Sequence, residues 1–148
     1  MIMARFTIRV YGLLVHNGRV LVADEIIKGQ RITKFPGGGL EYGEGTKDCL
    51  MREIMEEIGI EAYDVQHFYT TDFFQRSTFH AEEIQVVSIY YTFRVQSPSE
   101  LPVVEVAFAF KEERDGAEAF RWLELATATE GDVHLPIDRV VMKKLLSA

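Results

Sequence analysis

Short runs of apolar and β-branched residues recur along the chain and predict β-strands. The predicted strands cover residues 6–15, 19–23, 65–75, 84–95, 103–110 and 119–123. Asn17-Gly18 separates the first two and is typical of a tight hairpin, because both residues tolerate positive φ. The third and fourth strands are expected to pair with each other, whereas the polar residues 25–33 are expected to form a loop.

Two further segments space their apolar residues as helices do. A helix is predicted over residues 46–58, with an apolar stripe formed by Leu50, Ile54 and Ile58. Thr46 suits its N-cap, and Gly59 suits the left-handed residue that ends a helix. A closing helix is predicted over residues 136–146, where Pro136 fits the first turn. Because strands and helices are mixed without regular βαβ alternation, the pattern favours an α/β fold with a mixed sheet between helices.

Three consecutive glycines stand before the first predicted helix. Lys34 and Phe35 are expected to form a short strand that stops at Pro36, which has no N–H for a strand ladder. Residues 37–39 then let the backbone approach closely whatever lies above it.

Length and composition are those of an ordinary soluble globular protein. The 148 residues suffice for a single domain, residues 1–148, with its own core. No apolar run is long enough to cross a bilayer, and Arg5 and Arg9 interrupt the first ten residues, where a signal peptide needs an apolar stretch. The lone cysteine allows no internal disulfide. A cytoplasmic protein with no membrane partner is therefore predicted.

The net charge of −7 further limits the classes of partner that the protein is expected to bind. A protein that holds the nucleic-acid backbone needs a basic surface, so no nucleic-acid partner is predicted. Part of the acidity lies in Glu53, Glu56 and Glu57, which share one edge of the predicted helix at i, i+3 and i+4. Like charges at that spacing cost a bare helix about 0.2–0.5 kcal/mol per pair. A hard divalent cation such as Mg²⁺ reverses that cost, so the edge predicts a metal site.

The same segment carries a family resemblance. Its spacing matches the Nudix box at each defining position: Gly38, Glu44, Arg52, Glu53, Ile54, Glu56, Glu57, Gly59 and Ile60. Residues 35–38, which read Phe-Pro-Gly-Gly, precede the box much as they do in MutT-like members of that family. The chain thus resembles a small single-domain Nudix hydrolase, and the resemblance implies an α/β/α sandwich with a mixed β-sheet between helices.

The resemblance also implies an activity. It implies a hydrolase that uses Mg²⁺, with Mn²⁺ as an alternative, to cleave the diphosphate linkage of a nucleoside diphosphate joined to another moiety. Nucleoside triphosphates, ADP-ribose and sugar nucleotides all belong to this class of small-molecule partner, and many small members of the family form homodimers. The alternative is a nucleotide-binding Nudix sensor that binds such a ligand without turnover.

By the same resemblance the box residues have expected roles. The metal ligands are the box glutamates together with a backbone carbonyl of the glycine segment, namely Glu53, Glu56, Glu57 and either Gly37 or Gly38. Glu44 and Arg52 are expected to support these ligands. Arg52 is expected to orient Glu53, although pairing with Asp48 and Glu56 along the helix is the simpler alternative.

Candidates outside the box are fewer. The resemblance implies that the general base is either a box glutamate or a glutamate downstream of the box. Among the downstream ones Glu118 is ranked first, ahead of Glu112 and Glu113, with a solvent-facing strand residue as the alternative of equal weight. Phe74 and Arg76 are candidates for substrate binding, because an aromatic ring stacks on a base and a guanidinium meets a phosphate. Aromatic residues there more often form core or dimer contacts. Cys49, inside the box helix, is expected to be a packing residue rather than a nucleophile.

Overall fold

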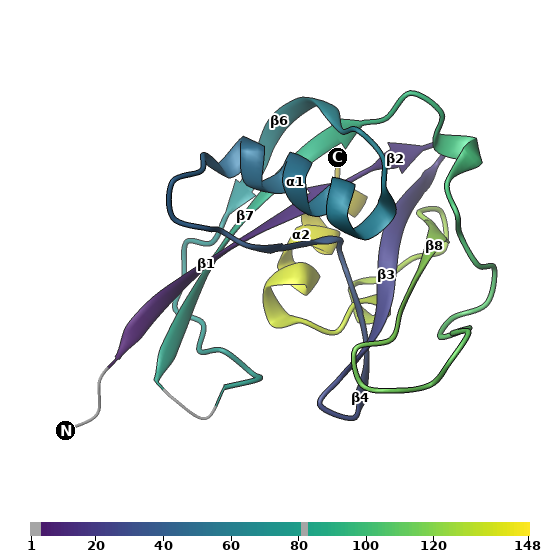
Figure 1. Cartoon of the computed structure of the whole chain (residues 1–148). Helices are drawn as coiled ribbons and strands as arrows, with labels where there is room; N and C mark the ends of the chain where they lie inside the picture. Colours follow the sequence, from purple (N-terminus) through teal and green to yellow (C-terminus); the bar gives the residue numbers. More distant parts are fainter. Residues whose placement is uncertain (1–3, 81–82) are drawn as a thin grey trace.

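The computed structural model describes residues 4–80 and 83–148 (Figure 1). In chain order its elements are β1 (Arg5–Leu13), β2 (Val15–His16), β3 (Arg19–Ile27), β4 (Gln30–Lys34), β5 (Gly37–Gly39), α1 (Thr46–Ile58), β6 (Tyr63–Thr70), β7 (Ile84–Arg94), β8 (Glu118–Glu124) and α2 (Pro136–Leu146). Single 3₁₀ turns cover Pro98–Glu100 and Glu130–Asp132. Neither α-helix is long and apolar enough to cross a membrane, among the residues described.

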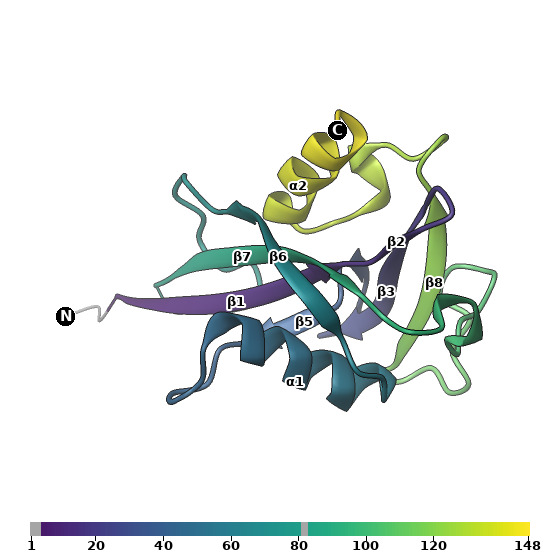
Figure 2. The same ribbon diagram turned by 90° about the horizontal axis from the view of Figure 1, so that it is seen from above.

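The strands form two four-stranded sheets. The first has the order β5-β1-β7-β6 and is mixed, because β1 and β7 run parallel while β5 and β6 pair antiparallel with their neighbours. In the second, β3 pairs antiparallel with β2, β4 and β8. Figure 2 shows the strands between α1 on one side and α2 on the other. The expected α/β/α sandwich is therefore confirmed.

The core is divided between the two faces of the first sheet by strand alternation. On the face toward α1, Val10 of β1 belongs to one buried cluster with Leu50 and Ile54 of the helix. On the opposite face, Tyr11 belongs to a second cluster with Val141 of α2. The apolar stripe predicted for residues 46–58 is thus the surface that holds α1 on the sheet.

Two features of the box helix follow the prediction from the sequence, and one does not. The helix covers the predicted residues 46–58, and Gly59 ends it in the left-handed conformation at φ 76°. The N-cap, however, is Gly45, with no side-chain cap, and Thr46 is the first helical residue. The hydroxyl of Thr46 lies instead within hydrogen-bond distance of the Tyr91 hydroxyl, so it ties the helix to β7.

Two predicted segments are wrong. Residues 25–33 are not a loop: β3 continues to Ile27, β4 begins at Gln30, and Lys28-Gly29 makes the turn with positive φ at both positions. Residues 103–110 form no strand, although two of their backbone N–H groups are bonded to β8 and β3. Val104 N–H donates to the Phe120 carbonyl at 2.8 Å and Phe108 N–H to Asp24 Oδ2 at 3.1 Å.

Smaller differences concern strand ends. The strand predicted over residues 65–75 is β6, which ends at Thr70. Residues 71–75 belong to no strand, although Thr71 N–H donates to the Ser88 carbonyl and the Gln75 carbonyl accepts from Val86 N–H. The antiparallel pairing of β6 with β7 is confirmed. Lys34 ends β4, and Phe35 lies outside any strand with its N–H donated to the buried Asp138 carboxylate at 3.1 Å.

Candidate active site

The glycine strand β5 lets carboxylates of α1 lie directly against the sheet edge. A Cβ added at Gly38 would stand 2.4 Å from the Glu53 carboxyl group. A Cβ at Gly37 would stand 2.1 Å from the Val10 carbonyl oxygen, and its φ of 151° disfavours any side chain. The close backbone approach expected for residues 37–39 is therefore where the acidic helix edge meets the sheet.

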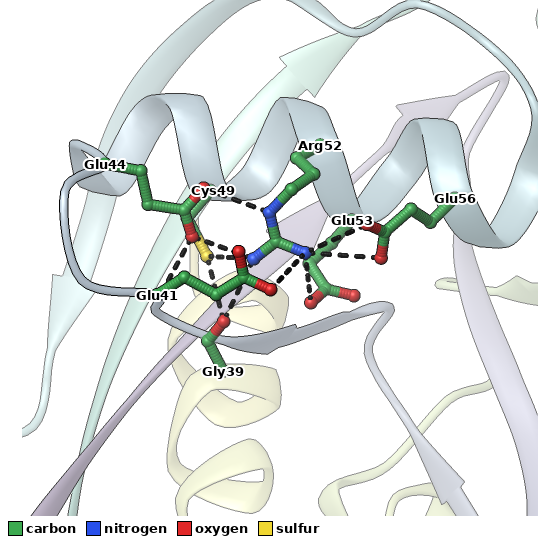
Figure 3. A network of polar contacts seen from close by, with 7 residues as sticks. All are labelled: Gly39, Glu41, Glu44, Cys49, Arg52, Glu53 and Glu56. Carbon is green, nitrogen blue, oxygen red and sulfur yellow. Dashed lines mark hydrogen bonds and ion pairs between the residues drawn. The ribbon is translucent and has the colours of Figure 1, made fainter.

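Arg52 binds one group of box carboxylates, Glu44, Glu53 and Glu56, which we call the outer side of the helix (Figure 3). Its guanidinium donates to both oxygens of Glu44, at 2.8 and 3.0 Å, and to Glu53 Oε1 at 3.1 Å. It also donates to Glu56 Oε2 at 3.2 Å and to the Gly39 carbonyl at 3.1 Å. The hydrogen bond from Arg52 lowers the pKa of Glu44 to about 2. These carboxylates are therefore compensated by the protein itself.

The contacts of Arg52 bear on both sequence expectations. The expected Arg52–Glu53 contact is present, and so is the i, i+4 pair with Glu56 from the simpler alternative. Asp48 is not among its ion pairs in the part of the chain that the structure describes. Cys49 lies buried beside this network, where burial raises the pKa of its thiol to about 12, which suits a packing residue.

On the inner side, Glu57 is not compensated in this way. Its Oε2 atom is buried and has no hydrogen-bond partner among the described residues. Burial raises the pKa of Glu57 to about 7, and repulsion from Glu53 and Glu25 adds to the rise, although Lys34 opposes it. An orphaned, buried carboxylate oxygen is costly unless something pairs with it.

Glu118 lies on the same inner side. It opens β8 directly opposite Glu25 of β3, and the two carboxyl groups are hydrogen-bonded. Burial raises the pKa of Glu118, and the bond to Glu25 and the charge of Glu57 add to the rise. The pKa of Glu25 is lowered although its burial opposes ionisation, because Glu118 and Lys34 donate to it. One proton is thus shared across the two strands beside Glu57.

The other candidates for the general base lie elsewhere. Glu112 and Glu113 are exposed on the segment before β8 and form ion pairs with Arg114 and Arg31 respectively. Of the three, Glu118 alone interacts electrostatically with Glu57.

A cavity of about 480 Å³ opens beside the inner carboxylates. Its floor consists of alternate residues of two strands paired in parallel register: Thr7, Arg9 and Tyr11 of β1 with Val86, Ser88 and Tyr90 of β7. Its walls include Glu53, Glu57, Glu25, Lys34, residues 75–80 and the beginning of α2 at residues 135–137. The volume falls in the range of small-molecule sites.

The aromatic segment before β7 contributes differently from expectation. Phe74 is 67% exposed and lies outside the residues that line the cavity. Arg76 lines the cavity, but its guanidinium pairs with Glu83 at 2.9 Å. Sequence reasoning missed Arg9, Tyr11 and Lys34, and the signal that could have found the first two is their alternate spacing on one strand face.

The donor set can be tested for its fit to a divalent cation. No three acidic, histidine or cysteine side chains gather into a metal cage within residues 4–80 and 83–148, where Arg52 holds Glu53 and Glu56 by ion pairs. Glu57 nevertheless keeps a buried oxygen without a partner among the described residues, while the Gly37 backbone N–H donates to the same carboxylate. Carboxylate oxygens are the ligands that Mg²⁺ prefers. The residues fit such a cation.

Comparison with known proteins gives three findings. The model of the NUDIX domain family matches residues 3–145. The RNA pyrophosphohydrolase of Teredinibacter turnerae is 42% identical over 50 residues, which are 34% of this chain and 29% of that protein. The RNA pyrophosphohydrolase of Pseudomonas savastanoi is 42% identical over 57 residues, covering 37% of this chain and 35% of the other. The chain thus spans about a third of the length of these relatives.

Solved structures agree on the fold. A MutT NUDIX hydrolase from Burkholderia pseudomallei superposes with a TM-score of 0.71 at 20% identity, covering 95% of this chain and 98% of that one. The E. coli ORF135 protein superposes with a TM-score of 0.69 at 18% identity, covering 97% and 91% respectively. At such identities the likeness concerns the arrangement of the backbone.

Proposed function

The chain belongs to the Nudix family, and from that premise we propose that it is a divalent-metal-dependent hydrolase of a diphosphate linkage. The substrate class is a nucleoside diphosphate linked to another moiety. The observation that carries the proposal is the inner carboxylate of Glu57, whose buried oxygen has no partner among the described residues and which lies against the glycine strand.

Glu53, Glu56 and Glu57, with a carbonyl of Gly37 or Gly38, are the proposed metal ligands, and Mg²⁺ is the proposed metal, with Mn²⁺ as an alternative. When bound, such a cation neutralises phosphate oxygens, orients the phosphoryl group and acidifies a water. The chain itself supplies the scaffold, because Arg52 holds Glu53 and Glu44 in fixed orientations.

Glu118 is the proposed general base, and the shared proton of the Glu25–Glu118 pair supports this role. Its raised pKa keeps the shared proton on Glu118, so this carboxyl group acts as a base once a cation bound at Glu57 has lowered that pKa. The pair lies beside Glu57, and Lys34 forms an ion pair with Glu25. The negative charge that remains when one of the two carboxyl groups holds the proton is therefore compensated by Lys34. The alternative, in which Glu118 is a solvent-facing strand residue, does not account for its hydrogen bond to Glu25.

The cavity supports a small ligand. Its volume of about 480 Å³ matches a nucleotide-sized molecule. A second candidate is the 5′ end of an RNA, which the similarity to RNA pyrophosphohydrolases favours. The net charge of −7 opposes it, since a bound RNA chain would need a basic path.

A turnover panel tests the proposal. Wild-type protein with Mg²⁺ would be offered nucleoside triphosphates, ADP-ribose, sugar nucleotides and a 5′-triphosphorylated RNA oligonucleotide, with products identified by mass. The Glu57→Gln variant, purified and assayed in the same way, measures the activity that comes from contaminating enzymes. Cleavage of a small nucleotide that Glu57→Gln lacks supports the proposal, whereas cleavage of the RNA alone selects the second candidate. Tight binding without any turnover would reject the hydrolase in favour of a sensor.

A further inference from the structure

Three cationic side chains line the cavity, and two of them already have carboxylate partners. Lys34 Nζ lies 3.4 Å from Glu25, and its side chain is 6% exposed. Arg76 pairs with Glu83 at 2.9 Å. Their charges are therefore largely satisfied within the protein.

Arg9 is the exception. Its one hydrogen bond to a described residue runs from Nε to the Tyr11 hydroxyl at 3.1 Å. No carboxylate of residues 4–80 or 83–148 lies within 4.0 Å of its guanidinium. A guanidinium has five N–H donors, so most of the hydrogen-bonding capacity of Arg9 faces the cavity unused. Glu53 and Glu25 attract this guanidinium from a distance, but neither carboxylate bonds it, so a half-buried cation keeps donors that an anionic ligand can use.

The surroundings of Arg9 fix where it points. It stands opposite Gly39 in the β1–β5 ladder, and a Cβ added at Gly39 would lie 3.3 Å from Arg9 Nη1. The guanidinium also lies 5.8 Å from the centre of the Tyr11 ring, which steadies it from the side of the floor. Glu53 acts on it electrostatically from beyond hydrogen-bond distance. Arg9 is therefore held next to the glycine strand and the acidic helix edge.

We propose that Arg9 is a substrate-binding residue that holds the diphosphate of the substrate from the sheet side, opposite the carboxylates of α1. The proposal rests on the proposed function, since it names the residue that receives the anion of that substrate. The planar fork of an arginine binds two phosphate oxygens at once, which a lysine cannot reproduce. Tyr11 acts as the positioning residue, because its hydroxyl and ring orient the fork.

A purely structural role for Arg9 is the competing explanation, because its stem packs beside Tyr11. Two substitutions separate the roles. Arg9→Met keeps an apolar stem and removes the charge, whereas Arg9→Lys keeps the charge and removes the fork. If Arg9 only packed against Tyr11, both variants would change stability without changing affinity for a phosphate ligand.

Calorimetry with imidodiphosphate, a diphosphate analogue that resists hydrolysis, tests the proposal in the presence of Mg²⁺. Arg9→Met is expected to weaken binding about 10- to 100-fold, the range of a charge-assisted hydrogen bond, and Arg9→Lys to recover part of that loss. Arg94→Met is the matched control, because the Arg94 side chain is 67% exposed at the end of β7, away from the cavity, where it meets Asp64 at 3.9 Å and the ring of Tyr63. Its affinity is expected to equal that of wild type.

Turnover measured on the same variants keeps this proposal distinct from the proposed function. Binding by Arg9→Met that equals wild-type binding, or a wild type that does not bind the analogue, would overturn the assignment of Arg9 while leaving the hydrolase standing if turnover is observed. Binding that depends on Arg9 in a protein without turnover would uphold the assignment and reject the hydrolase.

Discussion

The two sides of helix α1 use the same residue type in opposite ways. On the outer side, Arg52 donates to Glu44, and the pKa of Glu44 falls to about 2. On the inner side, burial raises the pKa of Glu57 to about 7, and one of its oxygens has no partner among the described residues. Carboxylates that Arg52 compensates and a carboxylate without such compensation thus lie within one turn of the same helix.

The difference indicates where a cation is needed. The outer cluster gains its positive charge from Arg52, which is part of the chain. The inner cluster of Glu57, Glu25 and Glu118 has Lys34 and a shared proton, which leave Glu57 uncompensated. Negative charge confined in a partly dry site favours a divalent ion strongly. The account therefore centres the metal on Glu57 at the inner side, with Glu53 and Glu56 as further ligands that Arg52 orients from the outer side.

The largest expected effect belongs to Glu57, the centre of the inner cluster. Glu57→Gln keeps the shape of the side chain but removes its charge, so the proposed site loses a metal ligand. Stabilisation of several kcal/mol by a metal corresponds to a loss in kcat of about 1000-fold or more. Steady-state kinetics on the substrate found by the panel measures it. Glu61→Gln, an exposed glutamate just after the helix, is the control, and a Glu57→Gln rate near that of this control would refute the comparison.

Gly38→Ala tests the contact between the two sides. The new Cβ would stand 2.4 Å from the Glu53 carboxyl group, which must move away because it is the end of a flexible side chain. A displacement of about 1 Å at a catalytic group costs about 100-fold in rate. Circular dichroism should show an unchanged fold while kcat falls. Gly131→Ala is the control, since its nearest atom lies at 3.5 Å, and equal rates in both variants would contradict the account.

The outer side should matter less. Arg52→Ala removes the donor that holds Glu44 and Glu53 but leaves the inner carboxylates in place. A loss of about 10- to 100-fold in kcat is expected, as for groups that orient metal ligands. Arg52→Lys should recover only part of it, because lysine lacks the planar fork. A rate loss as large as that of Glu57→Gln would show that the outer side is not merely supporting.

The smallest effect concerns stability against pH in protein stripped of metal with EDTA. The folded pKa of Glu57 is raised from its ordinary value of 4.5 to about 7, and that of Glu118 is raised as well. Between those values the folded state keeps protons that the unfolded chain has lost, so stability should be greatest near pH 4.5 and fall as pH rises through 7. Urea midpoints at several pH values measure this.

Glu57→Gln and Glu118→Gln remove the groups responsible and should each reduce that fall. Glu61→Gln again serves as the control. Midpoints that rise with pH in wild-type protein, or an unaltered fall in both variants, would count against the uncompensated inner cluster.

The sequence predicted those parts of the fold that depend on neighbouring residues. The apolar stripe of Leu50 and Ile54 with Gly59 behind it defines α1, and the acidic spacing brings Arg52 against Glu53. The extension of β3 and β4 escaped prediction because distant partners satisfy its polar side chains. For example, Arg121 donates to Asp24 at 2.7 Å, although the two residues are 97 positions apart in the sequence.

The features that the sequence did not predict depend on which side chains and strand edges already have partners in the folded protein. Residues 103–110 have strand-like composition, but their one backbone bond to β8 among the described residues, from Val104 N–H to the Phe120 carbonyl, is too little to form a strand ladder. Arg9 was missed because strand alternation shows that two faces differ without showing which one carries the cavity. Arg76 was favoured instead because the sequence does not reveal its partner Glu83.

The most direct test of the central claim is metal binding followed by the electron paramagnetic resonance of Mn²⁺. Wild-type protein, Glu57→Gln and Glu61→Gln would be titrated at pH 7.5 without substrate, which separates binding from turnover. The account predicts a site in wild type and in Glu61→Gln that Glu57→Gln weakens at least about 10-fold, as loss of a charged ligand requires. Equal Mn²⁺ affinity in all three proteins would contradict the assignment of the metal to the inner side of α1.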